Sequence, residues 1–532
     1  MKNLGRLAGI LWFMSSAWSV SAAEPRIGKF TKYDADEFVI VTSRSAAQAK
    51  HIVEDLGKFK RTLERTLGKN ATQNSFPTYI VITSATDWKN WLQPRENVEG
   101  YFQRARFSNV MALDGDWPPE EALHIVFHEY SHYYLASQFA GEYPPWYNEG
   151  LAELMSYAMF DKGRAILRIP MDQVHEARDT DWIPFERLIH VDQTDPEYQS
   201  HKLAPSFYAQ SWLTLHYGMV ENRDFGREIQ GYINDLNRLV PREEAARKNF
   251  GDLAAADKLL RDYSRQSKLS SGAIDLGELP PVTLPQGKPL DDTDSMAILA
   301  DLMLQVRMPP NHTRPLVEAL GRRDPNPARA AILAARLAQL EDDNAAFDAA
   351  VAKAEGALKP DDWEQRRDLA AVLLNSGLET SPMSSRKSAD AEHDLKRSLK
   401  WFAEAINHNS QDVAALWGFG TAATRLDKNL DLAEQALVAA YHRAPASGDI
   451  AVSLADLYGR QDKPEEKLPF LHDAIRNATD LSMKRWATEE LQRTEDYIVE
   501  RNRVAAENQK NREEYEKKLA EYEKKYGKVK RK

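Results

Sequence analysis

The chain has 532 residues, of which 42% are hydrophobic, and this length and composition suffice for roughly three or four domains with sizeable cores. Its formal net charge of −10 argues against general nucleic-acid binding by the whole chain. The absence of cysteine excludes disulfides and any lipid attached through a cysteine.

Residues 1–23 have the pattern of a secretory signal peptide. A short basic start is followed by a mostly apolar run, residues 7–20, and by the small residues Ala22 and Ala23, after one of which cleavage is expected. A membrane anchor would need about 20 apolar residues, and this run is shorter and contains three serines. We therefore expect a periplasmic or secreted protein with no stable membrane span after cleavage.

The region that follows, up to about residue 120, alternates predicted strands with predicted helices. The expected strands are residues 38–42, 79–83, 100–103 and 108–113, and the expected helices are residues 46–67 and 87–92. The last two strands are close in sequence, so we expect them to pair with each other.

The stretch 122–136, ALHIVFHEYSHYYLA, predicts a helix that carries the chemistry of the chain. His128 and His132 are four residues apart, so their imidazoles lie on one helix face and suit a shared metal ion. Neutral imidazole is a good ligand for Zn²⁺, and Glu129 can take a proton from zinc-bound water without occupying a coordination place. The alternative is that both histidines are core residues bonded to backbone carbonyls. The apolar surroundings disfavour it, because burying this cluster without a partner is costly.

A second motif, PPWYNEGLAE at residues 144–153, makes the pattern more specific. H-E-x-x-H followed by W-x-N-E-G-x-A-E resembles the gluzincin zinc metallopeptidases, the group that includes thermolysin-like enzymes. By position, the resemblance implies Glu149 as the third zinc ligand, Glu153 as the acidic residue that hydrogen-bonds a ligand histidine, and Asn148 as a similar outer partner. The stretch between His132 and Glu149 is slightly shorter than in the best-known members, so the connecting loop must differ.

The resemblance also implies an α+β zincin-like metallopeptidase domain spanning residues 24–266. In such a domain the strand at 108–113 would lie at the edge of the cleft, where an extended peptide substrate can add as a further strand. An ordinary interior strand is the alternative for 108–113.

The helix predicted at 204–217 contains a Y-x-Q-S sequence that resembles the helix following the zinc site in such peptidases. Tyr208 in this sequence is the candidate donor to the oxyanion of peptide hydrolysis. The alternative for Tyr208 is an aromatic side chain packed in the core. His190, His201 and His216 are weaker candidates for the same role.

Residues 267–292 are rich in Ser, Gly and Pro and predict a linker. Residues 293–480 are helical and rich in Ala and Leu, and two units aligned at Asn409 and Ala444 are offset by 35 residues. This resembles degenerate tetratricopeptide repeats, which imply an α-helical solenoid with a surface for a protein partner; a helical spacer is the alternative. Residues 481–532 predict a long, charged C-terminal helix.

Together these features predict a zinc-dependent metallopeptidase that acts on peptide or protein substrates, with Glu129 as general base. A non-catalytic zinc-site and repeat protein of the cell envelope is the competing hypothesis. Hydrolysis of another amide or of cell-wall cross-bridges fits the same residues.

Overall fold

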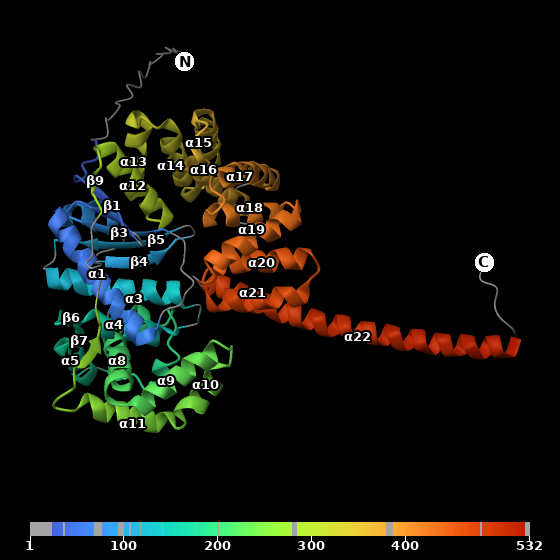
Figure 1. Ribbon diagram of the computed structural model, residues 1–532, viewed down its shortest axis with the longest axis horizontal. Coiled ribbons are helices and arrows are strands. Elements are labelled where there is room, and N and C mark those ends of the chain that lie inside the picture. Colours follow the sequence, from blue (N-terminus) through green and yellow to red (C-terminus); the bar gives the residue numbers. More distant parts are fainter. Residues whose placement is uncertain are drawn as a thin grey trace, which may run out of the picture.

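The computed structural model describes residues 24–35, 38–68, 77–93, 100–105, 108–116, 119–139, 141, 143–179, 181–200, 202–278, 285–378, 387–478 and 481–526 (Figure 1). The predicted signal peptide at residues 1–23 lies outside these residues, as does His201. Within the described part of the chain, no helix is both long enough and apolar enough to cross a membrane.

A mixed six-stranded sheet forms the centre of the N-terminal half. In spatial order its strands are β4 (Gly100–Arg104), β5 (Asn109–Asp114), β3 (Thr78–Thr83), β2 (Val39–Thr42), β1 (Thr31–Asp34) and β9 (Lys288–Pro289). Strands β2, β3 and β5 are parallel, and β4, β1 and β9 are antiparallel to their neighbours. The four predicted strands are confirmed, and so is the pairing of the last two; β1 and β9 have no counterpart in the sequence prediction.

Strand β4 is the edge strand, which corrects the expectation that residues 108–113 would lie there. Strand β5 is enclosed between β3 and β4 and is buried along its whole length, whereas the residues of β4 are half-buried or exposed. The chain reverses after β4 and places the more apolar strand in the interior, where its side chains leave water on both faces.

The helix predicted at residues 46–67 is confirmed with both its ends. The helices of this half are α1 (Ala46–Leu67), α2 (Ala85–Asp87), α3 (Pro119–Gln138), α4 (Pro145–Ser156), α5 (Met171–Asp179), α6 (Phe185–Leu188), α7 (Pro196–Gln199), α8 (Ala204–His216), α9 (Arg223–Leu236), α10 (Arg242–Phe250) and α11 (Leu253–Ser264), with π-helical turns at Trp88–Leu92 and Tyr217–Glu221. Helix α1 begins at a capping box, in which Ser45 and Gln48 each accept a backbone N–H of the other.

The two faces of the six-stranded sheet carry separate cores because side chains alternate along a strand. Ile80 and Met111 pack with residues of α1 and α3 on one face. Val81 and Val110 pack on the other face with residues of the first helices after residue 291. One hydrophobic core therefore contains residues from both sides of the predicted domain boundary at residue 293.

A smaller antiparallel sheet consists of β6 (Ala158–Asp161), β7 (Arg164–Leu167) and β8 (Gly272–Asp275). Strands β8 and β9 both lie inside the segment 267–292, which the sequence predicts to be a linker. The prediction is wrong for these two strands, because each provides backbone partners to a sheet edge that would otherwise be unpaired. Residues 279–284 of the predicted linker lie outside the described residues.

The C-terminal half is a curved stack of helices: α12 (Asp292–Gln305), α13 (Pro310–Arg323), α14 (Pro327–Leu340), α15 (Asn344–Ala357), α16 (Trp363–Leu378), α17 (Ser388–His408), α18 (Val413–Arg425), α19 (Leu430–Arg443), α20 (Gly448–Arg460) and α21 (Pro464–Arg476). Consecutive helices pack against each other from α12 to α15 and from α16 to α21, and α14 packs against α16. Helices α17 and α19 end 35 residues apart, at His408 and Arg443. The predicted solenoid of helical repeats is confirmed at this level.

The long helix predicted at the C-terminus is α22 (Leu481–Tyr526), a single helix of 46 residues. It leaves the stack and extends into solvent for most of its length (Figure 1). Its buried residues are Ala487 and Thr494, both near the stack.

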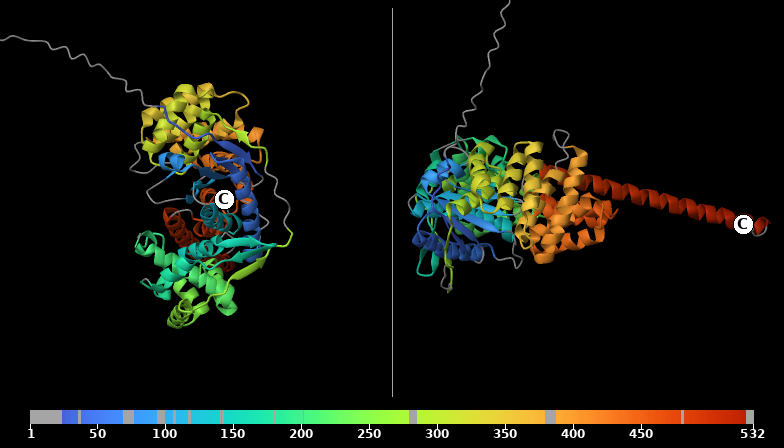
Figure 2. Two further views of the ribbon diagram at one scale, coloured as in Figure 1. Left: turned by 90° about the vertical axis from the view of Figure 1, so that its left-hand side faces the viewer. Right: turned by 90° about the horizontal axis from the view of Figure 1, so that it is seen from above.

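The helix stack bends back toward the N-terminal half, so that α20 and α21 lie beside it (Figures 1 and 2). Two contacts hold this end of the stack. The guanidinium of Arg104 at the end of β4 donates to the backbone carbonyl of Ala446, with a distance of 2.9 Å. Leu239, between α9 and α10, packs against a small core formed by α20, α21 and the start of α22.

Candidate metal centre

Helix α3 is anchored by aromatic side chains on the face opposite its histidines. Phe127 stacks on Phe59 of α1 with ring centroids 4.1 Å apart, and the hydroxyl of Tyr134 donates to the carbonyl of Gly68 at 2.6 Å. Val126 and Tyr130 are buried in the same core. With this face fixed, the helical period points His128 and His132 toward the neighbouring α4.

Helix α4 brings its own polar residues to α3 through a tight contact with α8. It begins after Pro144, with Pro145 at the first helical position, where the missing N–H of proline costs no hydrogen bond. A Cβ placed on Gly150 would lie 2.5 Å from the carbonyl oxygen of Ser211 in α8. The glycine therefore permits a close approach of the two helices, and this approach sets the position of the adjacent Glu149.

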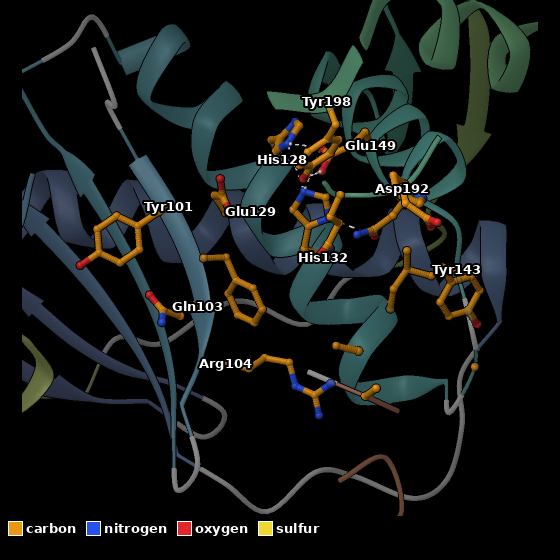
Figure 3. Close-up of a pocket in the computed structure, with 18 of the residues that line it drawn as sticks. Tyr101, Gln103, Arg104, His128, Glu129, His132, Tyr143, Glu149, Asp192 and Tyr198 are labelled. Carbon is orange, nitrogen blue, oxygen red and sulfur yellow. Dashed lines mark hydrogen bonds and ion pairs between the residues drawn. The ribbon is translucent and has the colours of Figure 1, made fainter. Parts of the chain in front are cut away.

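Three atoms from α3 and α4 form a small triangle at the centre of the site (Figure 3). His128 Nε2 lies 3.1 Å from His132 Nε2, and Glu149 Oε2 lies 3.3 Å and 3.4 Å from these two nitrogens. Four ligands at about 2.0–2.1 Å from a tetrahedral metal ion are separated from one another by about 3.3 Å. Glu149 Oε2 is buried and has no hydrogen-bond partner among the described residues. These three residues could hold a metal ion.

The electrostatics of the cluster favour a cation. Burial by itself would lower the pKa of His128, but the nearby carboxylates of Glu149 and Glu153 outweigh it and raise this pKa well above the usual value. His132 behaves in the same way, mainly because of Glu149. Burial would raise the pKa of Glu149, yet the two histidines hold it far below its usual value. A buried carboxylate that stays ionised needs positive charge beside it.

Outer partners fix the orientation of both imidazoles. Asn148 Oδ1 lies 3.0 Å from His132 Nδ1, and Glu153 Oε1 lies 3.4 Å from His128 Nδ1. These are the positions that the gluzincin resemblance implies for Asn148 and Glu153. The amide of Gln173 on α5 donates to the other oxygen of Glu153 at 3.2 Å, a contact without any signal in the sequence. With Nδ1 engaged, each histidine directs Nε2 toward the triangle.

Glu129 lies beside the triangle and points toward β4 (Figure 3). Burial raises the pKa of this carboxyl, and the positive charges of the histidines and a hydrogen bond from the backbone N–H of Phe102 oppose the shift. The edge strand thus holds the carboxylate next to the triangle. Glu129 takes no part in the three short contacts between the candidate ligands.

Two tyrosines extend the site beyond Glu149. The hydroxyl of Tyr198 donates to Glu149 Oε1 at 2.8 Å, and the hydroxyls of Tyr198 and Tyr208 are hydrogen-bonded to each other. The charge of Glu149 raises the pKa of Tyr198, and burial raises that of Tyr208. Tyr208 therefore contacts Glu149 only indirectly, through the hydroxyl of Tyr198. The sequence prediction missed Tyr198, for which an aromatic residue in the short polar helix α7 was the only signal.

Two of the weaker candidates lie away from the site. His216 is fully buried; its Nδ1 lies 2.8 Å from the hydroxyl of Tyr263 and its Nε2 lies 3.1 Å from the carbonyl of Ser270. His190 Nδ1 lies 2.7 Å from the carbonyl of Glu186. Neither histidine lines the cleft around Glu149. Neither His190 nor His216 is therefore placed to donate to an oxyanion in the cleft, because hydrogen bonds outside the cleft hold both side chains.

The triangle opens into a cleft of about 1040 Å³. One wall consists of β4 and α3, and another includes Asp192, Tyr198, Tyr208 and Arg242. A third part of the lining comes from the end of α21 and the start of α22, residues 475–478, 481 and 484. The sequence does not indicate this contribution, because these residues are more than 300 positions from the histidines.

No family model matches the chain, and no curated protein is similar to it. Among solved structures, the tetratricopeptide-repeat protein YrrB, described as having an unusual peptide-binding site, is 18% identical; the match covers 37% of this chain and 92% of that chain with a TM-score of 0.27. This similarity is too small to carry an argument about fold or function.

Proposed function

We propose that the chain is a zinc-dependent peptidase whose centre is His128, His132 and Glu149 with Glu129 as general base. The observation that carries the proposal is the triangle of ligand atoms at tetrahedral spacing. One of these atoms is a buried carboxylate oxygen that has no hydrogen-bond partner among the described residues. Two neutral imidazoles and one carboxylate are a donor set that suits zinc, and a fourth position would remain for water or substrate.

The gluzincin assignment is part of this proposal. It is supported by the order of the two motifs and by the contacts of Asn148 and Glu153 with the candidate ligand histidines. It is also supported by a mixed sheet whose edge strand borders the cleft. The helical stack would then be a tetratricopeptide-like solenoid, for which we propose a protein partner.

A bound zinc ion would act as a Lewis acid toward the scissile carbonyl and would lower the pKa of a nearby water. Glu129 accepts the proton of this water and passes it to the leaving amine. Its pKa, raised by burial, is closer to neutral pH than that of an exposed glutamate, which makes the carboxyl more effective in both transfers. The N–H of Phe102 keeps the carboxylate in place.

Strand β4 offers a place for the peptide. Among the described strands it pairs only with β5, so its outer backbone groups other than the N–H of Phe102, which binds Glu129, are available to an extended substrate. Tyr208 remains the proposed oxyanion donor, with Tyr198 as the residue that positions Glu149. For Tyr208 to act, its hydroxyl must leave the oxygen of Tyr198 and turn toward the substrate.

Export is the remaining part of the proposal. It rests on the predicted signal peptide at residues 1–23. Cell fractionation and N-terminal sequencing of the mature protein test it: cleavage after Ala22 or Ala23 is expected, and an unprocessed protein in the cytosol would contradict it.

The decisive experiment compares the wild type with Glu129→Gln, using Glu186→Gln, a change at an exposed carboxylate outside the cleft, as the matched control. Glu129→Gln is expected to keep one zinc ion per chain and to lose at least 10³-fold in kcat, because the general base is removed. Peptide libraries and cell-wall fragments serve as substrates. Hydrolysis of cell-wall fragments alone would change the substrate class. A zinc-loaded wild type that cleaves neither would favour the non-catalytic interaction protein.

A further inference from the structure

Arg104 is the last residue of the edge strand and extends into the cleft on the side of His132 (Figure 3). Side chains alternate along a strand, so Arg104 lies on the same face as Phe102, whose N–H holds Glu129. Two residues of a strand span about 6.6 Å. The guanidinium therefore belongs to the part of the cleft that a substrate occupies just beyond the reacting bond.

The charge of Arg104 has no carboxylate partner within ion-pair distance among the described residues. Within the part of the chain that the structure describes, its one hydrogen bond is to the carbonyl of Ala446, at 2.9 Å. Two other cations of the cleft lining are neutralised: Arg242 pairs with Asp192 at 3.0 Å, and Arg476 pairs with Asp473.

The surroundings of Arg104 make this lack of a partner costly. The side chain is half-buried, and burial lowers the pKa of the guanidinium more than the charge of Asp449, which is not within ion-pair distance, raises it. A partly desolvated cation gains free energy when an anion replaces the lost water.

We propose that Arg104 binds a carboxylate of the substrate, so that the enzyme selects peptides with an acidic side chain or a free C-terminus about two residues from the cleaved bond. This inference rests on the proposed peptidase function. Guanidinium has five N–H donors in a planar fork that matches a carboxylate with two parallel hydrogen bonds. The bond to Ala446 uses one donor and leaves the others for the substrate.

The contact with Ala446 also gives the solenoid a role in specificity. Ala446 lies between α19 and α20, some 340 residues from Arg104 in sequence, and its carbonyl restricts the guanidinium to the cleft. An arginine that is already positioned loses less conformational entropy on binding than a free one. The helical stack thus positions the residue that recognises the substrate.

The test uses hexapeptides that carry one Glu at each position in turn, each with a Gln counterpart, and each made with a free C-terminus and as an amide. Binding is measured by fluorescence anisotropy on zinc-loaded Glu129→Gln protein, and hydrolysis is measured on protein with Glu129 intact. In each background Arg104→Gln and Arg104→Lys are compared with Arg227→Gln. Arg227 is exposed and far from the cleft lining, so this control removes the same charge.

At least one carboxylate peptide is expected to bind about tenfold or more tightly than its neutral counterpart. Arg104→Gln should bring this ratio to about one, Arg104→Lys should retain part of it, and Arg227→Gln should leave it unchanged. Zinc content should stay constant in all three variants, and Arg227→Gln should also leave the melting temperature and the cleavage of neutral peptides unchanged. The Glu and C-terminal series then show which carboxylate is recognised.

The outcomes separate this inference from the function on which it rests. Cleavage without any carboxylate preference, or a preference that survives Arg104→Gln, would overturn the role of Arg104 and leave the peptidase proposal intact. A carboxylate preference that depends on Arg104, in a protein that cleaves none of the peptides, would support the binding site and count against the peptidase.

Discussion

The contact between Gly150 and α8 makes a single added methyl group a test of the metal centre. In Gly150→Ala the new Cβ would lie 2.5 Å from the carbonyl oxygen and 2.7 Å from the carbonyl carbon of Ser211, where ordinary contacts begin at 3.4 Å. Both atoms belong to a helix backbone that cannot rotate away. Helices α4 and α8 would therefore have to separate by about 0.7 to 0.9 Å at this point.

That displacement is large compared with what a metal site tolerates. Glu149 Oε2 precedes Gly150 on the same helix and lies 3.3 Å and 3.4 Å from the two candidate ligand nitrogens. Metal–ligand distances vary by only about 0.2 Å between sites. We therefore expect Gly150→Ala to weaken zinc binding by about 10- to 100-fold. Overpacking should also lower the free energy of unfolding by about 1–3 kcal/mol.

The assay is zinc affinity by competition with a coloured chelator, together with thermal unfolding. Gly321→Ala in α13 is the matched control, because a Cβ there meets nothing within 4 Å. We expect this variant to keep its zinc affinity and to gain about 0.5–1 kcal/mol of stability. If Gly150→Ala bound zinc as tightly as the wild type, then Glu149 would not be a ligand held in place by the contact of α4 with α8.

Three further predictions concern the metal, the tyrosines and a structural carboxylate. Chelation should abolish hydrolysis and lower the melting temperature, and one equivalent of zinc should restore both; full activity after complete metal removal would contradict the ligand assignment. Tyr208→Phe should lower kcat by roughly 10²–10³ with unchanged zinc content, whereas Tyr198→Phe removes the donor to Glu149 Oε1 and should weaken zinc binding instead; the opposite pattern in kinetics and metal analysis would exchange the two roles. Burial would raise the pKa of Asp257, but hydrogen bonds, first among them one from the indole of Trp182, lower it below its usual value. Its contribution to stability is therefore present above about pH 4 and is lost as the pH falls through the lowered pKa of the folded state. Asp257→Asn should cost about 1.5–3 kcal/mol at pH 7 and progressively less in acid, and a cost that does not change with pH in denaturant titrations would refute the assignment.

The sequence by itself determined the local features of this protein. The apolar period of residues 46–67 predicts α1 with both its ends. The four-residue step from His128 to His132 predicts two imidazoles on one helix face. These properties depend on neighbours within one or two helical turns, and so they can be read directly from the residues.

The choice of edge strand was decided only by the tertiary structure. The sequence predicts both β4 and β5 as strands, but their order in the sheet depends on pairing with strands far away in sequence. The formation of β8 and β9 was also decided by the tertiary structure, because these two short strands pair with sheet edges formed by other segments.

The set of residues that line the candidate site shows most clearly what only the tertiary structure decides. The contact between Tyr198 and Glu149 joins residues 49 positions apart, and the one between Arg104 and Ala446 joins residues 342 positions apart. No pattern of spacing encodes such contacts, because the free energy that forms them comes from the packing of whole helices and of the curved stack. The sequence determines which groups can act as ligand, base or cation, and the tertiary structure determines which of them meet in the cleft.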